Sequence, residues 1–89
     1  MTDSKNILRA FSSLPRIKLL RCLKDKEKNV SQLIKNCGLS QSAVSQHLKK
    51  LKNWGLISCQ KQGKKVYYKL TKKNAALIAE KLLVFYKHL

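Results

Sequence analysis

Apolar side chains recur three or four residues apart along most of the first half of the chain, which is the spacing of a buried helix face. This pattern predicts a first helix within residues 5–13, a second over 15–23 and a third over 30–37. Charged residues at 24–29 interrupt it and indicate a solvated loop between the second and third helices.

A short turn then leads into a fourth helix. Gly38 can adopt the left-handed conformation that ends a helix, and Ser40 can cap the next helix through its hydroxyl. Ser31 is expected to cap the third helix in the same way. The fourth helix continues to Gly55, and its inward stripe is Val44, Leu48 and Leu51. Two helices joined by a tight glycine turn predict a helix-turn-helix.

Residues 56–60 and 66–70 are typical of two strands, joined by a tip at which Gly63 supplies the positive φ of a tight turn. Thr71 is expected to cap a last helix, with an apolar side that includes Ala75, Ile78, Leu82 and Phe85. The order α-α-α-α-β-β-α is that of a winged helix-turn-helix, an α+β fold. A chain of 89 residues is expected to form a single domain, 1–89.

The charge of the chain is strongly one-sided. Twenty Lys and Arg face four Asp and Glu, which gives a formal net charge of +16. Excess lysine can serve solubility alone, but a surface this basic repels itself and favours a polyanionic partner. No apolar run approaches the roughly 20 residues of a membrane span, and the N-terminus has no apolar leader. We therefore expect a cytoplasmic protein that binds nucleic acid and not a membrane.

The outward face of the fourth helix carries short polar side chains instead of a ladder of charges. Glutamine can pair with adenine, and serine can donate to or accept from several base edges. The sequence therefore predicts a helix that reads the major groove, and the alternative is a polar face without a partner. His47 is next to Leu48 of the inward stripe. It can either pack at the edge of the helix or contact a DNA phosphate, and the sequence leaves both roles possible. The predicted DNA-reading residues are Gln41, Ser42, Ser45, Gln46 and Lys49.

Three lysines flank the tip of the hairpin, Lys61, Lys64 and Lys65. A hairpin of this kind can lie along the minor groove and contact phosphates. Lysines also protect an exposed strand edge from aggregation, and the two roles are compatible.

No catalytic constellation is present in the sequence. The two histidines are distant, the four carboxylates are scattered, and no glycine-rich phosphate loop occurs. Cys22, Cys37 and Cys59 are an odd number, far apart in sequence, which fits neither a disulfide framework nor a zinc ribbon. We expect neither an enzyme nor a cofactor.

The stretch LSQSAVSQHLKKLKNWGLI, followed by KQGKKVYYKL, resembles the ArsR/SmtB family of bacterial transcriptional regulators. The segment FSSLPRIKLLRCL is similar to the start of that family's second helix. The resemblance implies a homodimer, built on the first and last helices, that binds an imperfect palindrome and usually represses. It also places Gln41, Ser42, Ser45 and Gln46 where the family reads bases. The implied dimer residues are Ile7, Leu8, Phe11, Ile78, Leu82 and Phe85, unless these pack only within their own monomer.

The sensor sites of the family are not matched. Where one metal site has Cys-Val-Cys, this chain has Asn-Val-Ser at 29–31, and the last helix offers only Glu80 and His88, so no metal is expected. The chain is most similar to the non-metal, thiol-sensing branch, which uses one cysteine on the second helix and one on the last. Cys22 lies near the first position, but the last helix has none. That branch's intramolecular dithiol switch is therefore not expected, and Cys22 is either a redox thiol or a buried free cysteine.

These observations predict a sequence-specific regulator of transcription that binds double-stranded DNA as a dimeric repressor. The alternatives are an architectural or weakly specific nucleic-acid-binding protein, a ligand-independent regulator that antagonises another DNA-binding protein and, last, a protein of the membrane surface. The sequence does not identify a small-molecule or redox inducer.

Overall fold

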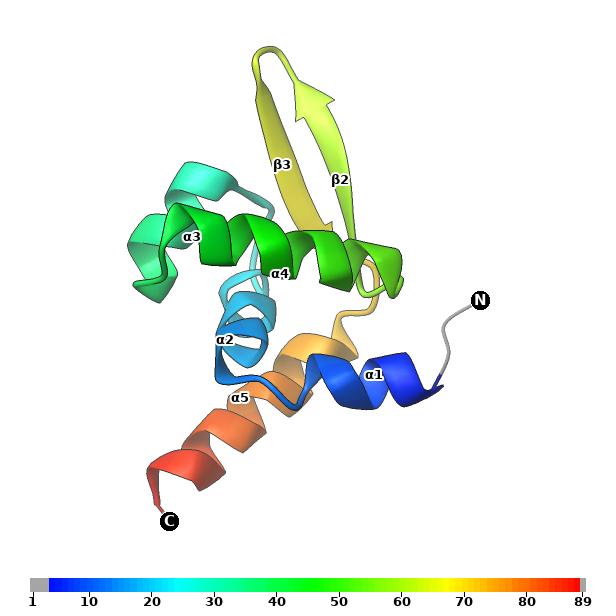
Figure 1. Cartoon of the computed structure of the whole chain (residues 1–89), viewed down its shortest axis with the longest axis vertical. Coiled ribbons are helices and arrows are strands. Elements are labelled where there is room, and N and C mark those ends of the chain that lie inside the picture. The colour runs from blue at the N-terminus through cyan, green and yellow to red at the C-terminus, as the bar shows by residue number, and fades with distance from the viewer. Residues whose placement is uncertain (1–3, 89) are drawn as a thin grey trace.

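The computed structural model describes residues 4–88, in which five helices and three strands follow one another (Figure 1). Their order confirms the predicted α+β winged helix-turn-helix, with one short strand added. The elements are α1 (Ser4–Ala10), α2 (Leu14–Cys22), β1 (Lys28–Asn29), α3 (Val30–Cys37), α4 (Gln41–Asn53), β2 (Ile57–Gln62), β3 (Lys65–Leu70) and α5 (Asn74–Lys87).

The added strand, β1, lies in the segment for which the sequence predicts only a charged loop. Lys28 pairs with Tyr68 and Asn29 pairs with Tyr67, both antiparallel, so the sheet order is β1-β3-β2. Two residues are too few to show the alternation by which a strand is recognised, and their pairing depends on a partner about 40 positions away. The loop prediction is therefore wrong for these two residues.

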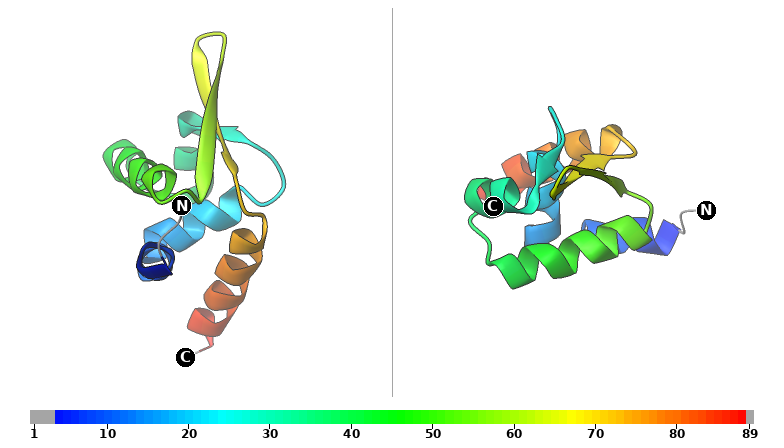
Figure 2. Two further views of the ribbon diagram at one scale, coloured as in Figure 1. Left: turned by 90° about the vertical axis from the view of Figure 1, so that its right-hand side faces the viewer. Right: turned by 90° about the horizontal axis from the view of Figure 1, so that it is seen from above.

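The core lies where α2 meets α3, α4 and α5. Leucines fill it, including Leu19 and Leu20 of α2, Leu33 of α3 and Leu51 of α4, all fully buried. In the left view of Figure 2 the β2–β3 hairpin projects from one end of the molecule, and α5 extends toward the other. Within residues 4–88, no helix is both long and apolar enough to cross a membrane.

The turn chemistry of the helix-turn-helix is confirmed. Gly38 has φ +66°, and its N–H donates to Ile34 O at 3.1 Å. The Ser40 hydroxyl accepts from Ala43 N at 3.2 Å, which caps the start of α4. Gly63, at the hairpin tip, has φ +65°. These positions fix the angle between α3 and α4 and the shape of the hairpin.

Two predicted caps are wrong. The cap of α3 is Asn29, not Ser31: its side chain accepts from Gln32 N, and the Gln32 side chain accepts from Asn29 N, both at 2.9 Å. This reciprocal pair satisfies two backbone donors at once, which a serine further along the helix cannot do. Thr71 does not cap α5 either, because its hydroxyl donates to Gly55 O at 2.5 Å and Lys73 holds the cap position.

The apolar side predicted for the last helix is divided between two faces. Ala79 and Leu83 face the core together with Ala75, whereas Ile78 and Phe85 are 47% and 66% exposed. Leu82 is exposed as well. Small side chains let α5 approach α2 closely, and the larger ones remain outside. Of the predicted apolar side, Ala75 therefore faces the core, whereas Ile78, Leu82 and Phe85 lie on the outer face, where the resemblance placed dimer residues.

Candidate nucleic-acid interface

Helix α4 is held by one face and presents the other to solvent. Val44, Leu48 and Leu51 are at most 1% exposed, so the helix cannot rotate without pulling these side chains out of the core. The opposite face is exposed, and Figure 1 shows it free of covering elements. All five DNA-reading positions predicted for this face lie on it: Gln41, Ser42, Ser45, Gln46 and Lys49.

The first turn of α4 brings backbone and hydroxyl groups together at the helix N-terminus. Beyond its capping bond, the Ser40 hydroxyl lies 3.4 Å from the Ser42 hydroxyl. No acidic residue occupies this turn. The short side chains leave the first turn accessible, and the positive end of the helix dipole favours a phosphate there.

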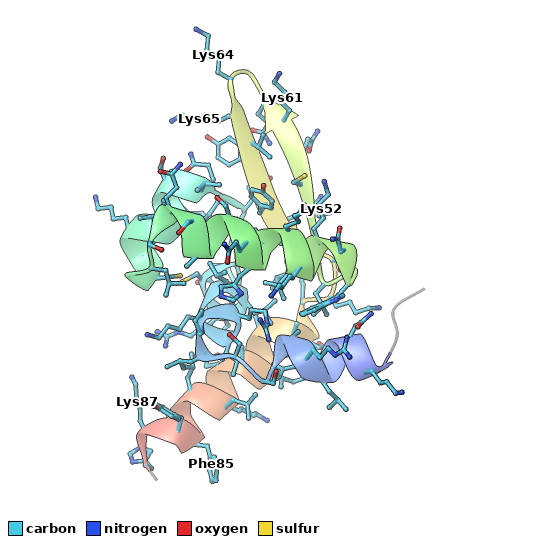
Figure 3. All side chains as sticks on the ribbon, in the orientation of Figure 1. Lys52, Lys61, Lys64, Lys65, Phe85 and Lys87 are labelled. Atoms are coloured by element: carbon cyan, nitrogen blue, oxygen red, sulfur yellow. The ribbon has the colours of Figure 1, made fainter. Side chains whose placement is uncertain are left out.

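The β2–β3 hairpin projects past α4, and lysines lie around its tip. Lys61, Lys64 and Lys65 are exposed around the tip, and Figure 3 shows them at the end of the molecule beyond α4. At the same tip, Gln62 Nε2 donates to Glu27 Oε1 at 3.0 Å, which ties the hairpin to the segment before β1. A tethered hairpin holds its lysines in a narrower range of positions than a free one.

The surface formed by α4 and the β2–β3 hairpin differs from the rest of the molecule in its charge. Neither α4 nor the β2–β3 hairpin contains an acidic residue. The ion pair that the structure describes, Lys24 Nζ to Glu80 Oε2 at 2.8 Å, joins the loop after α2 to α5, away from α4. The residues of α4 and the hairpin therefore carry only positive charge, and Glu27, which contacts Gln62, is an acidic residue beside them. A surface of this kind favours a polyanion.

His47 packs against α2. Its Nδ1 lies 3.4 Å from Arg16 Nη1, and the Arg16 guanidinium also lies over the Trp54 ring, 5.3 Å from its centroid. Arg16 Nη2 donates to Arg9 O at 2.7 Å, so this one side chain links α1, α2 and α4. Burial, followed by the charges of Arg16 and Lys50, holds the pKa of His47 below its ordinary value. This contact favours the packing role, because it places the ring against a side chain of α2.

The Arg16 cluster was not found from the sequence. The sequence offers Arg16 only as one of several candidates for contact with the DNA backbone, because the residues that it joins lie 7, 31 and 38 positions away from it. A weak signal existed: an arginine one residue after a helix-starting proline, in a helix that must pack on its neighbours. The sequence could not say which neighbours.

The three cysteines are free thiols and partly buried. Cys22 and Cys37 lie 15 positions apart in sequence, but the fold brings them to the lining of one cavity. The Cys37 Sγ donates to Lys18 O at 3.8 Å. Among residues 4–88, no group of three or more His, Cys, Asp and Glu side chains could hold a metal ion.

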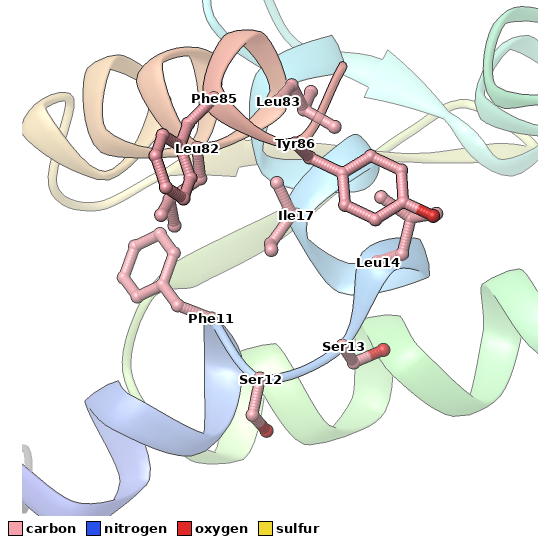
Figure 4. A pocket seen from close by; sticks show the side chains of 9 residues that line it. All are labelled: Phe11, Ser12, Ser13, Leu14, Ile17, Leu82, Leu83, Phe85 and Tyr86. Carbon is pink, nitrogen blue, oxygen red and sulfur yellow. The ribbon is translucent and has the colours of Figure 1, made fainter. Parts of the chain in front are cut away.

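The face of α1 and α5 away from the core carries the predicted dimer residues. Leu8 of α1 is 71% exposed, and Ile78, Leu82 and Phe85 of α5 are exposed as well. The predicted residues Ile7 and Phe11 are half-buried. A cavity of about 260 Å³ opens here, between the α1–α2 turn and the end of α5, and Figure 4 shows Phe11, Leu82 and Phe85 converging at its edge.

Comparison with known proteins identifies the family. Residues 15–58 match the family model for bacterial regulatory proteins of the arsR family. The transcriptional activator HlyU of Vibrio cholerae is 36% identical over 76 residues, which are 85% of this chain and 70% of HlyU. The nodulation protein NolR of Rhizobium meliloti is 39% identical over 61 residues, which are 68% of this chain but only 50% of NolR.

Solved structures agree with the sequence matches. The structure of HlyU from Vibrio cholerae superposes with a TM-score of 0.79 at 34% identity and covers 93% of this chain and 90% of that one. The transcriptional repressor BigR from Xylella fastidiosa gives a TM-score of 0.80 at 28% identity, covering 91% and 83%. These relatives are regulators of transcription and not enzymes. The chain therefore belongs to the ArsR family of bacterial regulatory proteins and is a DNA-binding transcriptional regulator with a winged helix-turn-helix.

Proposed function

We propose that this protein binds a two-fold symmetric site on double-stranded DNA as a homodimer and represses the adjacent promoter by occluding it. The observation that carries the proposal is the exposed, acid-free face of α4 beside a lysine-tipped hairpin. A helix held by three buried residues presents a fixed set of side chains, which is what a major-groove reader needs.

On this proposal the polar residues of α4 read base edges. Gln41 and Ser45 lie one helical turn apart on the exposed face, with Ser42 and Gln46 beside them. Glutamine pairs with adenine in bidentate fashion, and the serine hydroxyls accept or donate according to the base they meet. Four uncharged side chains give sequence preference without adding to the affinity for all DNA.

On this proposal the lysines contact the phosphate backbone of the DNA. Lys49 lies on the same face of α4, and Lys61, Lys64 and Lys65 extend the positive surface along the hairpin. Contacts of this kind position the protein on the duplex and carry no sequence information themselves. His47 is proposed to act through Arg16, by keeping α4 at its angle to α2, and not as a phosphate ligand.

The dimer is proposed to form through α1 and α5. Large apolar side chains are exposed on both helices, Leu8 on α1 and Ile78 and Phe85 on α5, and a partner would remove them from water. A second copy supplies one by two-fold symmetry, with each surface covering its equivalent. The symmetry would also place the two α4 helices about one DNA turn, roughly 34 Å, apart.

Repression is proposed because BigR and the SmtB proteins of Mycobacterium tuberculosis are described as repressors, although HlyU is described as an activator.

We treat residues 1–89 as one DNA-binding domain without catalytic activity, acting in the cytoplasm where the bacterial chromosome lies. A ligand-independent regulator that antagonises another DNA-binding protein would use the same surface.

A sequence-blind, architectural mode of binding is the competing function, and the charge of +16 is the observation that favours it. Duplexes are selected by the protein from a random pool, and a selected duplex then competes with bulk DNA for the protein at fixed salt. Specific binding predicts that the selected duplex competes about 10³-fold or more better than bulk DNA. Equal competition would replace the specific function by the architectural one.

A further inference from the structure

Two helices end at the same place, and each ends in a cysteine. Cys22 is the last residue of α2, and Cys37 is the last residue of α3. Both side chains are half-buried and line one cavity of about 260 Å³, outside the surface proposed for DNA. The structure therefore brings together two thiols that lie 15 positions apart in the chain.

The cavity around the two thiols is basic. Lys18 and Arg21 of α2 line it, and Lys87 reaches it from the end of α5 (labelled in Figure 3). The remaining lining residues, Asn36 and Leu83, are uncharged. Lys28 lies beside it and donates its ammonium hydrogen to Cys22 O. Among the described residues no carboxylate lines this cavity, so nothing there balances the positive charge by itself.

The surroundings of the two thiols make their roles unequal. The neighbouring Cys37 thiol, helped by the charges of Lys28, Arg21 and Lys18 and opposed by burial, lowers the pKa of Cys22 to about 7. The neighbouring Cys22 thiol, with burial, raises the pKa of Cys37, whose Sγ donates to Lys18 O at 3.8 Å. Near neutral pH Cys22 is therefore the thiol that ionises, and Cys37 keeps its proton. A thiolate is the nucleophilic form of cysteine.

We propose that Cys22 and Cys37 form a reactive dithiol that reduces hydroperoxides and closes into an intrachain disulfide. The proposal rests on the cavity that the two thiols share and on the cations that surround it. It requires neither DNA binding nor a dimer, so its outcome is independent of the proposed function.

The reaction balances with hydrogen peroxide as the oxidant. The Cys22 thiolate attacks one peroxide oxygen, the O–O bond breaks, and the departing hydroxide takes a proton from solvent to become water. Cys22 is then a sulfenic acid. The Cys37 sulfur attacks the Cys22 sulfur, the S–O bond breaks, and the hydroxyl leaves as water with the Cys37 proton. Two electrons pass from the two thiols to the peroxide, and one S–S bond forms.

The neighbours suit each step. Lys18, Arg21 and Lys28 stabilise the thiolate and the departing hydroxide through their positive charge. Cys37 lines the same cavity as Cys22, so the sulfenic acid can be resolved within that cavity. The disulfide would join the ends of α2 and α3, one residue before Gly38 and the turn into α4.

The direct test is peptide mapping of the whole protein. The reduced protein is treated with hydrogen peroxide, free thiols are alkylated, and the digest is analysed by mass spectrometry without reductant. The proposal predicts a Cys22–Cys37 linked peptide, lighter by two hydrogen atoms than the sum of its parts, with Cys59 alkylated. Links that involve Cys59, links only between two chains, or no link at all would overturn it.

Single variants test the separate roles of the two thiols. Cys37→Ala should accumulate a Cys22 sulfenic acid, trapped by dimedone, and should shift the midpoint of Cys22 alkylation upward from about pH 7. Cys59→Ala is the matched control, since Cys59 lies on β2 beside Lys52, and it should behave as the parent does. Circular dichroism confirms that each variant is folded. If the pH midpoint of Cys22 alkylation is the same in Cys37→Ala as in the parent, Cys37 does not lower the pKa of Cys22 and the proposed dithiol is wrong.

Discussion

Individual side chains of α4 are expected to decide the sequence preference. Gln41 and Ser45 lie one helical turn apart on the exposed face, and the buried stripe beneath them holds the helix in place. Replacing Gln41 by Ala removes a bidentate partner without disturbing Val44 or Leu48. We expect a loss of about 1–3 kcal/mol at a selected site and little change on random DNA, measured by fluorescence anisotropy.

Asn74→Ala is the matched control for this variant, because it removes an exposed amide from the first residue of α5. It should bind both DNAs as the parent does. An equal loss on selected and random DNA for Gln41→Ala would mean that Gln41 contributes to backbone affinity and not to base reading.

His47 predicts a pH dependence of stability. Burial and the charges of Arg16 and Lys50 depress its pKa in the folded state, so the folded protein favours the neutral ring. The unfolded chain then binds the proton first as the pH falls through about 6.5, and stability is lost from there down to the lower folded pKa. His47→Gln keeps an acceptor for Arg16 without a titrating group.

Thermal unfolding at about pH 7.5 and about pH 5.5 checks this expectation, since the ordinary histidine pKa lies between those values. The melting temperature of the parent should fall more on acidification than that of His47→Gln. Equal falls would show that the Arg16 contact does not bias the protonation of His47.

At the scale of an element, α3 depends on its first turn. Asn29 is 7% exposed and forms one half of the capping box with Gln32. Asn29→Ala should lower the free energy of unfolding by about 1 kcal/mol, within the range of roughly 0.5–2 kcal/mol for removal of a cap, measured by urea denaturation. Ser31→Ala is the control: it changes an exposed serine two positions later and should be nearly neutral. The reverse order of effects would restore Ser31 as the cap.

The hairpin is expected to act as a sequence-independent clamp. Replacing Lys64 and Lys65 together by Ala should weaken binding to all DNA alike. It should also reduce the log–log salt slope by about 1.8, or about 0.9 for each phosphate that the protein no longer neutralises. The charge-matched control replaces Lys72 and Lys73, which are exposed in the segment before α5. A slope that changes equally in both variants would place the hairpin outside the interface.

Elements differ in how far the sequence determines them. The stripe Val44, Leu48 and Leu51 fixed α4 and its outward face, because helical geometry alone assigns the opposite side. The division of α5 into a core face with Ala79 and Leu83 and an outer face with Phe85 was not predictable, since all are apolar and only the position of α2 decides between them. β1 and the cavity that Cys22 and Cys37 share likewise depend on partners distant in sequence.

At the scale of the whole molecule, the apolar face of α1 and α5 predicts association. Phe85 is 66% exposed, and a charge there would be buried between two copies at a cost that an interface does not tolerate. Phe85→Glu should therefore sediment as a monomer under conditions in which the parent is a dimer. Val66→Glu, at an exposed apolar residue of the hairpin, is the control and should remain dimeric. If the parent protein itself sediments as a monomer, the proposed dimer is wrong.

On the proposed function, α4 and the β2–β3 hairpin together form the DNA surface. Nuclear magnetic resonance of isotope-labelled protein, titrated with a selected duplex, locates that surface, since each backbone amide reports separately. We predict that the perturbed amides concentrate at the start and outer face of α4, from Gln41 to Lys49, and at the hairpin tip, from Lys61 to Lys65. Perturbations that concentrate on another surface and leave α4 unchanged would contradict the claim.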